Sequence, residues 1–513
     1  MDFNILDCTL RDGGYYTNWD FDWALVEGYS RAMERLPVTY VEIGYRSIPL
    51  KGYLGEYFYC PDHVMRELKA LMPSKKLAII LNEKDIRKEV VKDLLTPAIP
   101  YISLIRIAVD PKNFERAITL AKAIKEMGFE VAFNVMYMSN WKEDNRFLDL
   151  LNGMDDVIDF FYMVDSFGGI IPDDIKEIIA LVRSKTSVKL GFHGHNNLEM
   201  ALINTITALE QGCVMVDATV TGMGRGAGNL RTELLMTYLK SKDILDVKFS
   251  PLSNVVASFE DLKRNYGWGT NMPYMFSGAF SLPQKQVMEW VGMNRYPLVN
   301  IINALNNQKE SLEDNIELSK LSADVDIDSA IILGGGPSTI NHISAIKQLA
   351  AKSSNLCLIH AGVRNVTAYS EIENKQYYAL AGFESEKLLL GTRDISELKH
   401  TCVYPPYPRK MGTVIPDSLK KISVELKAIT FTNASSDSPL AIAIQTALDL
   451  GINKLFMAGF DGYDATINQV QFKLAQENQN ILKDAAKLKG VQITFVTPTR
   501  YRNVQSTSIY SLI

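Results

Sequence analysis

Cysteine is scarce in this sequence, and the cysteines that occur form no pattern. Only five are present among 513 residues, and no two of them stand in a Cys-x-x-Cys pair. Scattered cysteines in odd number argue against a disulfide framework and a zinc ribbon, and they indicate reduced thiols. The sequence also has no basic leader before a short apolar segment, and no run of about 18 apolar residues. We therefore expect a cytoplasmic protein with no membrane-spanning segment.

An excess of positive charge is also missing. Lysine and arginine total 54 against 59 acidic residues, which gives a net charge of −5. We therefore expect no nucleic-acid partner. What the sequence does contain is an ordinary globular composition, with 47% hydrophobic and 22% charged residues. Its length exceeds that of one compact core and indicates two domains.

The N-terminal half alternates short β-rich runs with amphipathic stretches. Helical spacing of apolar residues is clear at 114–127 and 173–185. Strands are expected at 3–6, 39–43, 77–81, 102–108, 130–135, 160–164, 188–192 and 214–220. Eight strands with helical crossovers over about 240 residues are typical of a (β/α)₈ TIM barrel. We therefore predict a barrel domain over 1–245, completed by a mainly helical extension over 246–320.

A second domain is predicted over 328–513. An apolar strand at 330–333 runs into a glycine turn, and a helix is expected at 439–450. Further strands are expected at 356–360, 454–458 and near 492–496. Repeated strand, turn and helix indicate a doubly wound, Rossmann-like α/β domain.

The glycine turn of this second domain is a candidate anion-binding site. The residues concerned are Gly334, Gly335, Gly336 and Ser338, with Asp461 after the strand at 454–458. A turn that leads into a helix can offer backbone N–H groups to an anion, although a glycine turn after a strand can equally be only a turn. Asp461 could contact a ribose or sugar hydroxyl, or it could cap its strand.

Two of the six histidines, His193 and His195, stand two residues apart. On a β-strand this spacing points both imidazoles to the same face. Two neutral imidazoles that converge on one point can bind a divalent metal. The alternative is a solvated pair at the end of a strand.

Further polar residues stand where the predicted barrel strands end. They are Arg11, Asp12, Glu42, Arg106, Asn134, Asp165 and Ser166, together with the two histidines. We expect the first strand to end at Arg11 and Asp12 and to turn through two glycines. Because the carboxyl ends of barrel strands carry the chemistry in this fold, these residues form one candidate site.

Three motifs occur in order at these strand ends. Leu-Asp-Cys-Thr-Leu-Arg-Asp-Gly-Gly starts at residue 6, His-Gly-His at residue 193, and Gly-Met-Gly-Arg-Gly-Ala-Gly-Asn at residue 222. Together they resemble the superfamily of metal-dependent aldolases and condensing enzymes, over residues 1–310. Members include 4-hydroxy-2-oxovalerate aldolase, hydroxymethylglutaryl-CoA lyase, and the isopropylmalate and citramalate synthases. The resemblance implies a carbon–carbon lyase.

The resemblance also implies roles for individual residues. Asp12, His193 and His195 match metal ligands, Arg11 matches the arginine that stabilises the enolate, Glu42 matches the acidic residue on the second strand, and Asn229 belongs to the glycine loop that closes the site. One carboxylate and two imidazoles leave open positions on an octahedral Mn²⁺ or Mg²⁺, where a 2-oxo acid can chelate. The metal would act as a Lewis acid, and the arginine would add a second counter-ion. The same ligand set could hold Fe²⁺ in an oxygenase, which the barrel and the arginine disfavour.

Several of these roles have a structural alternative. Glu42 could serve as an anchor for the neighbouring arginine. Arg106 could pair with a carboxylate or bind substrate, and Asn134 is a further candidate substrate contact. Asp165 and Ser166 could contact the substrate or only finish a strand. The glycine loop could be a tight turn, because glycine is favoured wherever φ is positive.

The sequence departs from the aldolases at Tyr15. The 4-hydroxy-2-oxovalerate aldolases carry a histidine base after the Arg-Asp-Gly turn, and an unperturbed phenol, with a pKa of about 10, is a poor base at neutral pH. The proton-transfer group could be Tyr15, a metal-bound water or a tyrosine of the 266–274 segment such as Tyr274. We predict a class II, pyruvate-type aldolase, which joins or separates a small 2-oxo acid and an aldehyde.

The segment from 438 to 463 resembles the flagellin-glycosylation accessory domains and the bacterial sialyltransferases. That resemblance implies a nucleotide-sugar or sugar-phosphate ligand, and with it a role in sugar or surface-polysaccharide metabolism. Two other interpretations stay open. One is an acyl-CoA condensing synthase, against which the missing synthase turn sequence counts. The other is a degenerate barrel that serves as the partner of a glycosyltransferase-like domain. We further expect a homo-oligomer.

Overall fold

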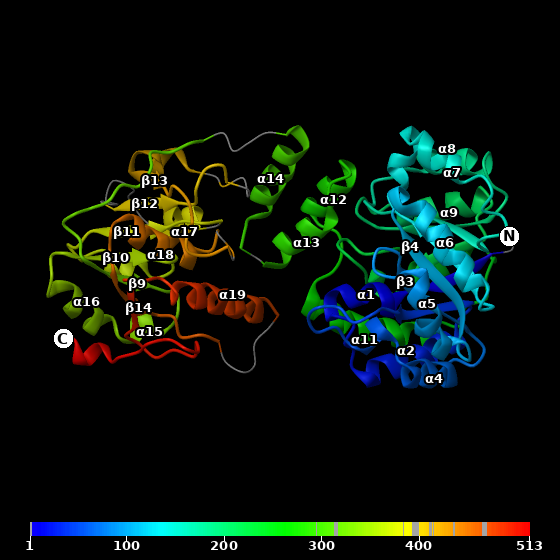
Figure 1. Cartoon of the computed structure of the whole chain (residues 1–513), viewed down its shortest axis with the longest axis horizontal. Coiled ribbons are helices and arrows are strands. Elements are labelled where there is room, and N and C mark those ends of the chain that lie inside the picture. The colour runs from blue at the N-terminus through cyan, green and yellow to red at the C-terminus, as the bar shows by residue number, and fades with distance from the viewer. Residues whose placement is uncertain are drawn as a thin grey trace. The chain divides into compact units, whose positions relative to one another are not determined.

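The chain folds into two units, divided between Met288 and Glu289 (Figure 1). The structure is a computed structural model and describes residues 3–293, 295–311, 316–382, 384–391, 400–409, 413, 415–433, 435, 437–463 and 469–513. Each helix in this described part is too short or too polar to span a bilayer.

The first unit is built on a closed barrel of eight parallel strands, which confirms the predicted TIM barrel. The strands are β1 (Asn4–Asp7), β2 (Tyr40–Tyr45), β3 (Lys76–Asn82), β4 (Ile102–Val109), β5 (Glu130–Val135), β6 (Phe160–Asp165), β7 (Lys189–Gly194) and β8 (Met215–Ala218). They follow one another around the barrel in chain order, and β8 closes it against β1. The longer helices between and after them are α2 (Trp23–Arg35), α4 (Asp62–Leu71), α5 (Lys88–Leu95), α6 (Phe114–Lys125), α8 (Pro172–Arg183), α9 (Ala201–Glu210) and α10 (Thr232–Ser241).

Alternation along the strands divides the apolar side chains between two cores. In β3, Leu77 and Ile79 belong to the large core that also contains the helices, whereas Ala78 belongs to a smaller core with residues such as Leu6 and Tyr162. Alternate residues of a barrel strand point inward and outward, so the smaller core fills the barrel interior. Strands buried on both faces read as apolar runs, and this is why the sequence predicts them well.

The segment that carries Arg11 and Asp12 is a helix, so the expected strand end and glycine turn are wrong there. The strand β1 has already ended, and α1 (Thr9–Thr17) carries both residues and the two glycines that follow. Glycine is required by close packing and not by a turn, because a Cβ added at Gly14 would lie 2.2 Å from the Trp19 ring. The helix holds Arg11 and Asp12 in buried positions above the barrel strands.

Four helices follow the barrel within the described residues. They are α11 (Phe249–Tyr266) and α12 (Met272–Ala279) in the first unit, α13 (Gln284–Met293) across the division, and α14 (Leu298–Glu310) in the second unit. The aromatic segment at 266–274 joins α11 to α12. Residues 312–315 of the predicted extension lie outside the described residues.

The second unit contains a parallel sheet, in which seven strands lie within the described residues. The strands are β9 (Ser329–Leu333), β10 (Leu356–His360), β11 (Gln376–Ala379), β12 (Thr401–Tyr404), β13 (Ser423–Glu425), β14 (Lys454–Ala458) and β15 (Gln492–Phe495). The sheet order is β13-β12-β11-β10-β9-β14-β15. The four strands expected from the sequence are present, and β11, β12 and β13, each of three or four residues, were not expected.

The order of this sheet reverses between β9 and β14. Chain order runs outward from β9 to β13 on one side, and β14 and β15 then extend the sheet on the other side. The helix α18 (Pro439–Asp449), which precedes β14, is almost wholly buried and packs on the sheet. The helices α16 (Ile343–Ala351) and α19 (Gln469–Ala485) also belong to this unit.

Candidate active site

A cavity of about 320 Å³ opens at the carboxyl ends of the barrel strands. The predicted site residues that line it are Arg11, Asp12, Tyr15, Asn134, Ser166, His193 and His195. Residues that the sequence did not single out, namely Tyr45, Lys84, Tyr137 and Arg225, line it as well. The fold thus brings residues from α1 and from six strands or the loops after them to one place.

Three buried side chains in this cavity could hold a metal ion. Asp12, His193 and His195 each offer one ligand atom, and these atoms all lie within 4.8 Å of one another. The Nε2 atom of His193 lies 3.9 Å from Asp12 Oδ2. His193 also lies close to Cys8 and Asp217, but burial raises the pKa of the Cys8 thiol. The first set therefore has the better donors, since its carboxylate and both imidazoles face the cavity.

The Nδ1 atom of each imidazole has a hydrogen-bond partner in the chain. His193 Nδ1 lies 2.7 Å from Asp217 Oδ2, and His195 Nδ1 lies 2.7 Å from the backbone oxygen of Asp165. Both oxygens accept, so each Nδ1 carries the proton and each Nε2 keeps its lone pair. Burial, the largest cause, lowers the pKa of His195 to about 3, so that this imidazole is neutral.

Asp12 is held as a carboxylate. Burial opposes its ionisation, but its pKa is lowered, chiefly by the charge of Arg11 and also by the hydrogen bond from Asn229. Arg11 Nη1 donates to Asp12 Oδ1 at 2.5 Å, and Asn229 Nδ2 donates to Asp12 Oδ2. The predicted loop residue Asn229 therefore lies against the candidate ligand itself.

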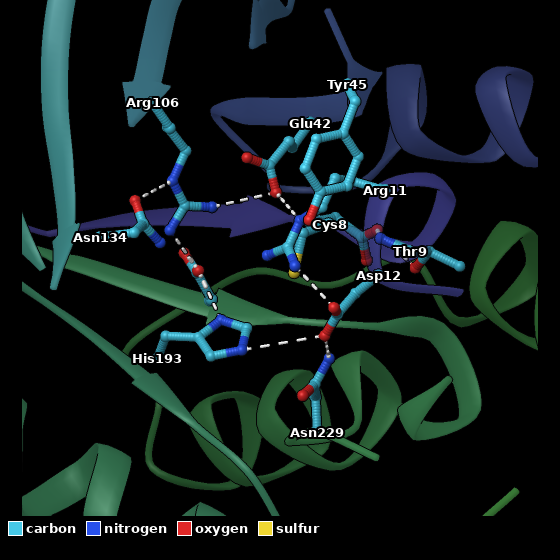
Figure 2. Close-up of polar contacts among 12 residues, drawn as sticks. Cys8, Thr9, Arg11, Asp12, Glu42, Tyr45, Arg106, Asn134, His193 and Asn229 are labelled. Atoms are coloured by element: carbon cyan, nitrogen blue, oxygen red, sulfur yellow. Dashed lines mark hydrogen bonds and ion pairs between the residues drawn. The ribbon is translucent and has the colours of Figure 1, made fainter. Parts of the chain in front are cut away.

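A buried chain of charged side chains connects two of the candidate metal ligands, Asp12 and His193 (Figure 2). Arg11 Nε donates to Glu42 Oε2 at 2.6 Å, and Arg106 Nη1 donates to the same oxygen at 3.2 Å. Arg106 Nη2 then donates to Asp217 Oδ2 at 2.5 Å, which is the carboxylate that holds His193. Glu42 and Arg106 are fully buried behind the cavity lining. Their geometry fits an anchoring role.

Asn134 and Ser166 line the cavity and also make contacts that fix their positions. Asn134 Oδ1 accepts from Arg106 Nε at 2.8 Å, and Ser166 Oγ accepts from the Tyr137 backbone N–H at 2.8 Å.

Asp165, in contrast, points its carboxylate into the loop after β6, where it accepts from Gly168 N at 2.9 Å and Gly169 N at 3.3 Å. Burial raises its pKa to about 6.

The two predicted tyrosines lie in different surroundings. Tyr15 lines the cavity, and its hydroxyl lies 3.2 Å from that of Tyr45. Tyr274 is buried beside Gly226 of the glycine loop and is not among the described residues that line the cavity. Burial raises the pKa of Tyr274 to about 12. Of these two tyrosines, the geometry leaves only Tyr15 facing the cavity.

Comparisons with known proteins identify relatives of the barrel domain. The profile of the HMGL-like family matches residues 105–256. An oxaloacetate decarboxylase of Mycobacterium tuberculosis is 28% identical over 239 residues, which cover 46% of this chain and 70% of that protein. A 4-hydroxy-2-oxovalerate aldolase of Pelotomaculum thermopropionicum is 30% identical over 251 residues, which cover 47% of this chain and 70% of that protein. This chain belongs to the HMGL-like family.

A solved structure also resembles this HMGL-like chain. It is the N-terminal domain of a candidate aldolase from Bacteroides vulgatus, with 54% sequence identity and a TM-score of 0.56, and the match covers 59% of this chain and all of that one. The relatives named above are carbon–carbon lyases, an aldolase and a decarboxylase, which confirms the predicted enzyme class.

In the second unit of this HMGL-like protein, backbone N–H groups of the glycine turn donate to acceptors within the chain. Gly334 N donates to Ala458 O at 2.8 Å, and Gly336 N donates to Gly459 O at 2.9 Å. Ser338 N donates to Asp461 Oδ2 at 2.8 Å. The structure thus brings Asp461 to the turn, where its carboxylate occupies the helix N-terminus. Gly335 and Gly336 line a separate cavity of about 680 Å³ in this unit.

Replacing Arg106 tests the buried chain of charges. In Arg106→Leu, Glu42 and Asp217 each lose a cation inside the barrel, so we expect the free energy of unfolding to fall by about 3–5 kcal/mol. The measurement is urea-induced unfolding followed by tryptophan fluorescence. The matched control is Arg31→Leu, which removes an exposed pair with Glu27 and should cost less than about 0.5 kcal/mol. Equal losses in the two variants would show that the buried chain contributes nothing.

Proposed function

We propose that this protein is a divalent-metal-dependent aldolase of the class II, pyruvate type. It would make or cleave the carbon–carbon bond between a 2-oxo acid and an aldehyde. The observation that carries this proposal is the buried group of Asp12, His193 and His195 beside Arg11, at the mouth of a TIM barrel. Relatives named as 4-hydroxy-2-oxovalerate aldolase and oxaloacetate decarboxylase support the reaction class.

The donor set fits a Mn²⁺ or Mg²⁺ ion. Asp12 is a carboxylate, and His193 and His195 each keep Nε2 free because Nδ1 is bound elsewhere. These three residues would hold the ion. When bound, the ion supplies Lewis-acid stabilisation of the charge that develops on the oxygens of the 2-oxo acid.

Arg11 would stabilise the same developing charge. Its Nε donates to Glu42 and its Nη1 donates to Asp12, whereas Nη2 has no hydrogen-bond partner among the described residues. The guanidinium lines the cavity and is held on two sides, so its third nitrogen can donate to a substrate oxygen without first being ordered. Glu42 and Arg106 would act by positioning this group.

Tyr15 would exchange the proton of the hydroxyl on the aldehyde carbon. In the cleavage direction, that hydroxyl loses its proton, the carbon–carbon bond breaks, and the electron pair of the bond moves onto the 2-oxo acid. Burial raises the pKa of Tyr45, so Tyr45 keeps its proton and can donate to the Tyr15 oxygen 3.2 Å away. Ser166 and Asn134 line the same cavity and would contact the carboxylate of the 2-oxo acid.

Removing one imidazole tests the metal site. We expect His195→Ala to bind Mn²⁺ more than about 100-fold more weakly and to lose cleavage of 4-hydroxy-2-oxo acids. Such a loss of affinity exceeds the loss that usually follows removal of a residue that only hydrogen-bonds to a metal ligand. Isothermal titration with Mn²⁺ and an assay for released 2-oxo acid measure both effects, with circular dichroism as a check of folding.

The control for this variant is His63→Ala, which changes an exposed histidine of α4. Equal Mn²⁺ affinity in His195→Ala and the control would refute the site. Release of free thiol from an acyl-CoA would favour a condensing synthase over an aldolase, and metal binding without any turnover would favour a non-catalytic barrel.

Exchanging Arg11 for lysine tests its role in stabilising charge. The guanidinium reaches Glu42 and Asp12 with two different nitrogens, and a single ammonium cannot reproduce that fork. We expect Arg11→Lys to retain Mn²⁺ binding and to lose about 100-fold in kcat. Steady-state kinetics of 2-oxo acid release at saturating Mn²⁺ provide the measurement, and an unchanged kcat would assign the role to another residue.

For the second unit we propose a doubly wound, Rossmann-like domain that binds a nucleotide sugar or a sugar phosphate. Support comes from the reversal of sheet order between β9 and β14, since ligands of open α/β sheets bind at the carboxyl ends of strands at such a point. The cavity of about 680 Å³ is lined by residues that follow β9, β10, β11 and β14. Fusion to this unit supports an aldolase role in sugar or surface-polysaccharide metabolism.

Arg364 provides the test of this second site. It follows β10, lines the cavity and is exposed, and among the described residues its one hydrogen bond is long, at 3.4 Å to Gly335 O. We expect Arg364→Met to weaken binding of UDP-glucose or glucose 1-phosphate about tenfold, because it removes a charged donor. Titration calorimetry on the full chain measures this. Absence of binding in the unaltered protein would contradict the proposed ligand class.

A further inference from the structure

Within the part of the chain that the structure describes, one arginine at the mouth of the barrel has no acidic partner. Arg225 stands in the glycine-rich loop after β8, is half-buried, and lines the same cavity as the candidate metal set. Its guanidinium lies over the Tyr15 ring, 5.8 Å from the ring centroid, and pairs with no carboxylate among the described residues. Arg11 and Arg106, by contrast, each contact two carboxylates.

The loop that presents Arg225 is fixed at that residue and directly after it. Tyr16 Oη donates to Gly226 O at 2.9 Å, and Gly228 N donates to Arg225 O at 3.2 Å. Gly226 and Gly228 have φ of 65° and 80°, values that glycine adopts without strain. The glycines thus allow the backbone conformation in which Arg225 lies at the cavity.

A second unpaired cation lines the same cavity from another side. Lys84 follows β3, is exposed, and its ammonium has no partner among the described residues. The acidic residue beside it, Glu83, is already paired with Arg116. Asp110 also lines the cavity, and its carboxylate accepts from the Lys112 backbone N–H of its own turn. Among the described residues that line the cavity, Arg225 and Lys84 are thus the cations that pair with no carboxylate.

We propose that Arg225, assisted by Lys84, binds an anionic group on the aldehyde part of the substrate. This inference rests on the proposed function and adds the substrate class: the aldehyde carries a carboxylate or a phosphate at the end away from the reacting carbon. The carboxylate of the 2-oxo acid would lie at Arg11 and the candidate metal ligands. A planar guanidinium that is half-buried and unpaired is suited to either anion, because both present two oxygens to its fork.

The test compares three 4-hydroxy-2-oxo acids of equal chain length on the full, Mn²⁺-loaded protein. Their far ends are a methyl group, a carboxylate and a phosphate monoester. We expect the unaltered protein to prefer one of the charged substrates in kcat/KM, and Arg225→Met to reduce that preference about 10- to 100-fold. Arg225→Lys should recover part of it. The control Arg31→Met, on the exposed face of α2, should keep the preference.

A second readout does not depend on turnover. Inorganic phosphate is titrated into the full chain without metal and followed by ³¹P line broadening. Saturable binding in the unaltered protein and in Arg31→Met, lost in Arg225→Met, would support the inference even if no oxo acid were cleaved and the proposed function failed. An unchanged substrate preference in Arg225→Met, or equal phosphate binding in Arg225→Met and the unaltered protein, would overturn it.

Discussion

The buried chain of alternating charges at the carboxyl end of the barrel is the constraint on which the site depends. Each ion in it would be costly to bury alone, and each is tolerated because it contacts at least one partner of opposite charge. Arg11 lies between Asp12 and Glu42, and Arg106 lies between Glu42 and Asp217. The chain therefore couples the packing of the barrel interior to the positions of two candidate metal ligands, Asp12 and His193.

Much of the barrel could be predicted from the sequence, because its strands are buried on both faces and read as apolar runs. The helix α1 could not. Its two glycines suggest a turn, whereas they are required by the close approach of Trp19 and Met223. The strands β11, β12 and β13 were missed for a different reason. They have only three or four residues each, too few to show a period.

The candidate site was predicted by residue type and by position at strand ends, and the contacts between residues were not. Asp217 illustrates the difference, since it stands inside the apolar strand β8 and holds His193. A carboxylate in a buried strand needs a partner, which is a signal that the sequence does carry. Arg225 was not predicted as a site residue. It stands between two glycines, and a glycine-rich motif indicates a backbone conformation and not a role for the side chain within it.

The central claim is that Asp12 and two imidazoles hold one divalent ion that a 2-oxo acid reaches. Electron spin echo spectroscopy of the full chain loaded with one equivalent of Mn²⁺ tests it most directly, because it detects nitrogens bound to the ion. The account predicts modulation from two histidine nitrogens, and a change in the spectrum when pyruvate is added. A protein that binds no Mn²⁺, or whose bound Mn²⁺ couples to no nitrogen, would contradict it.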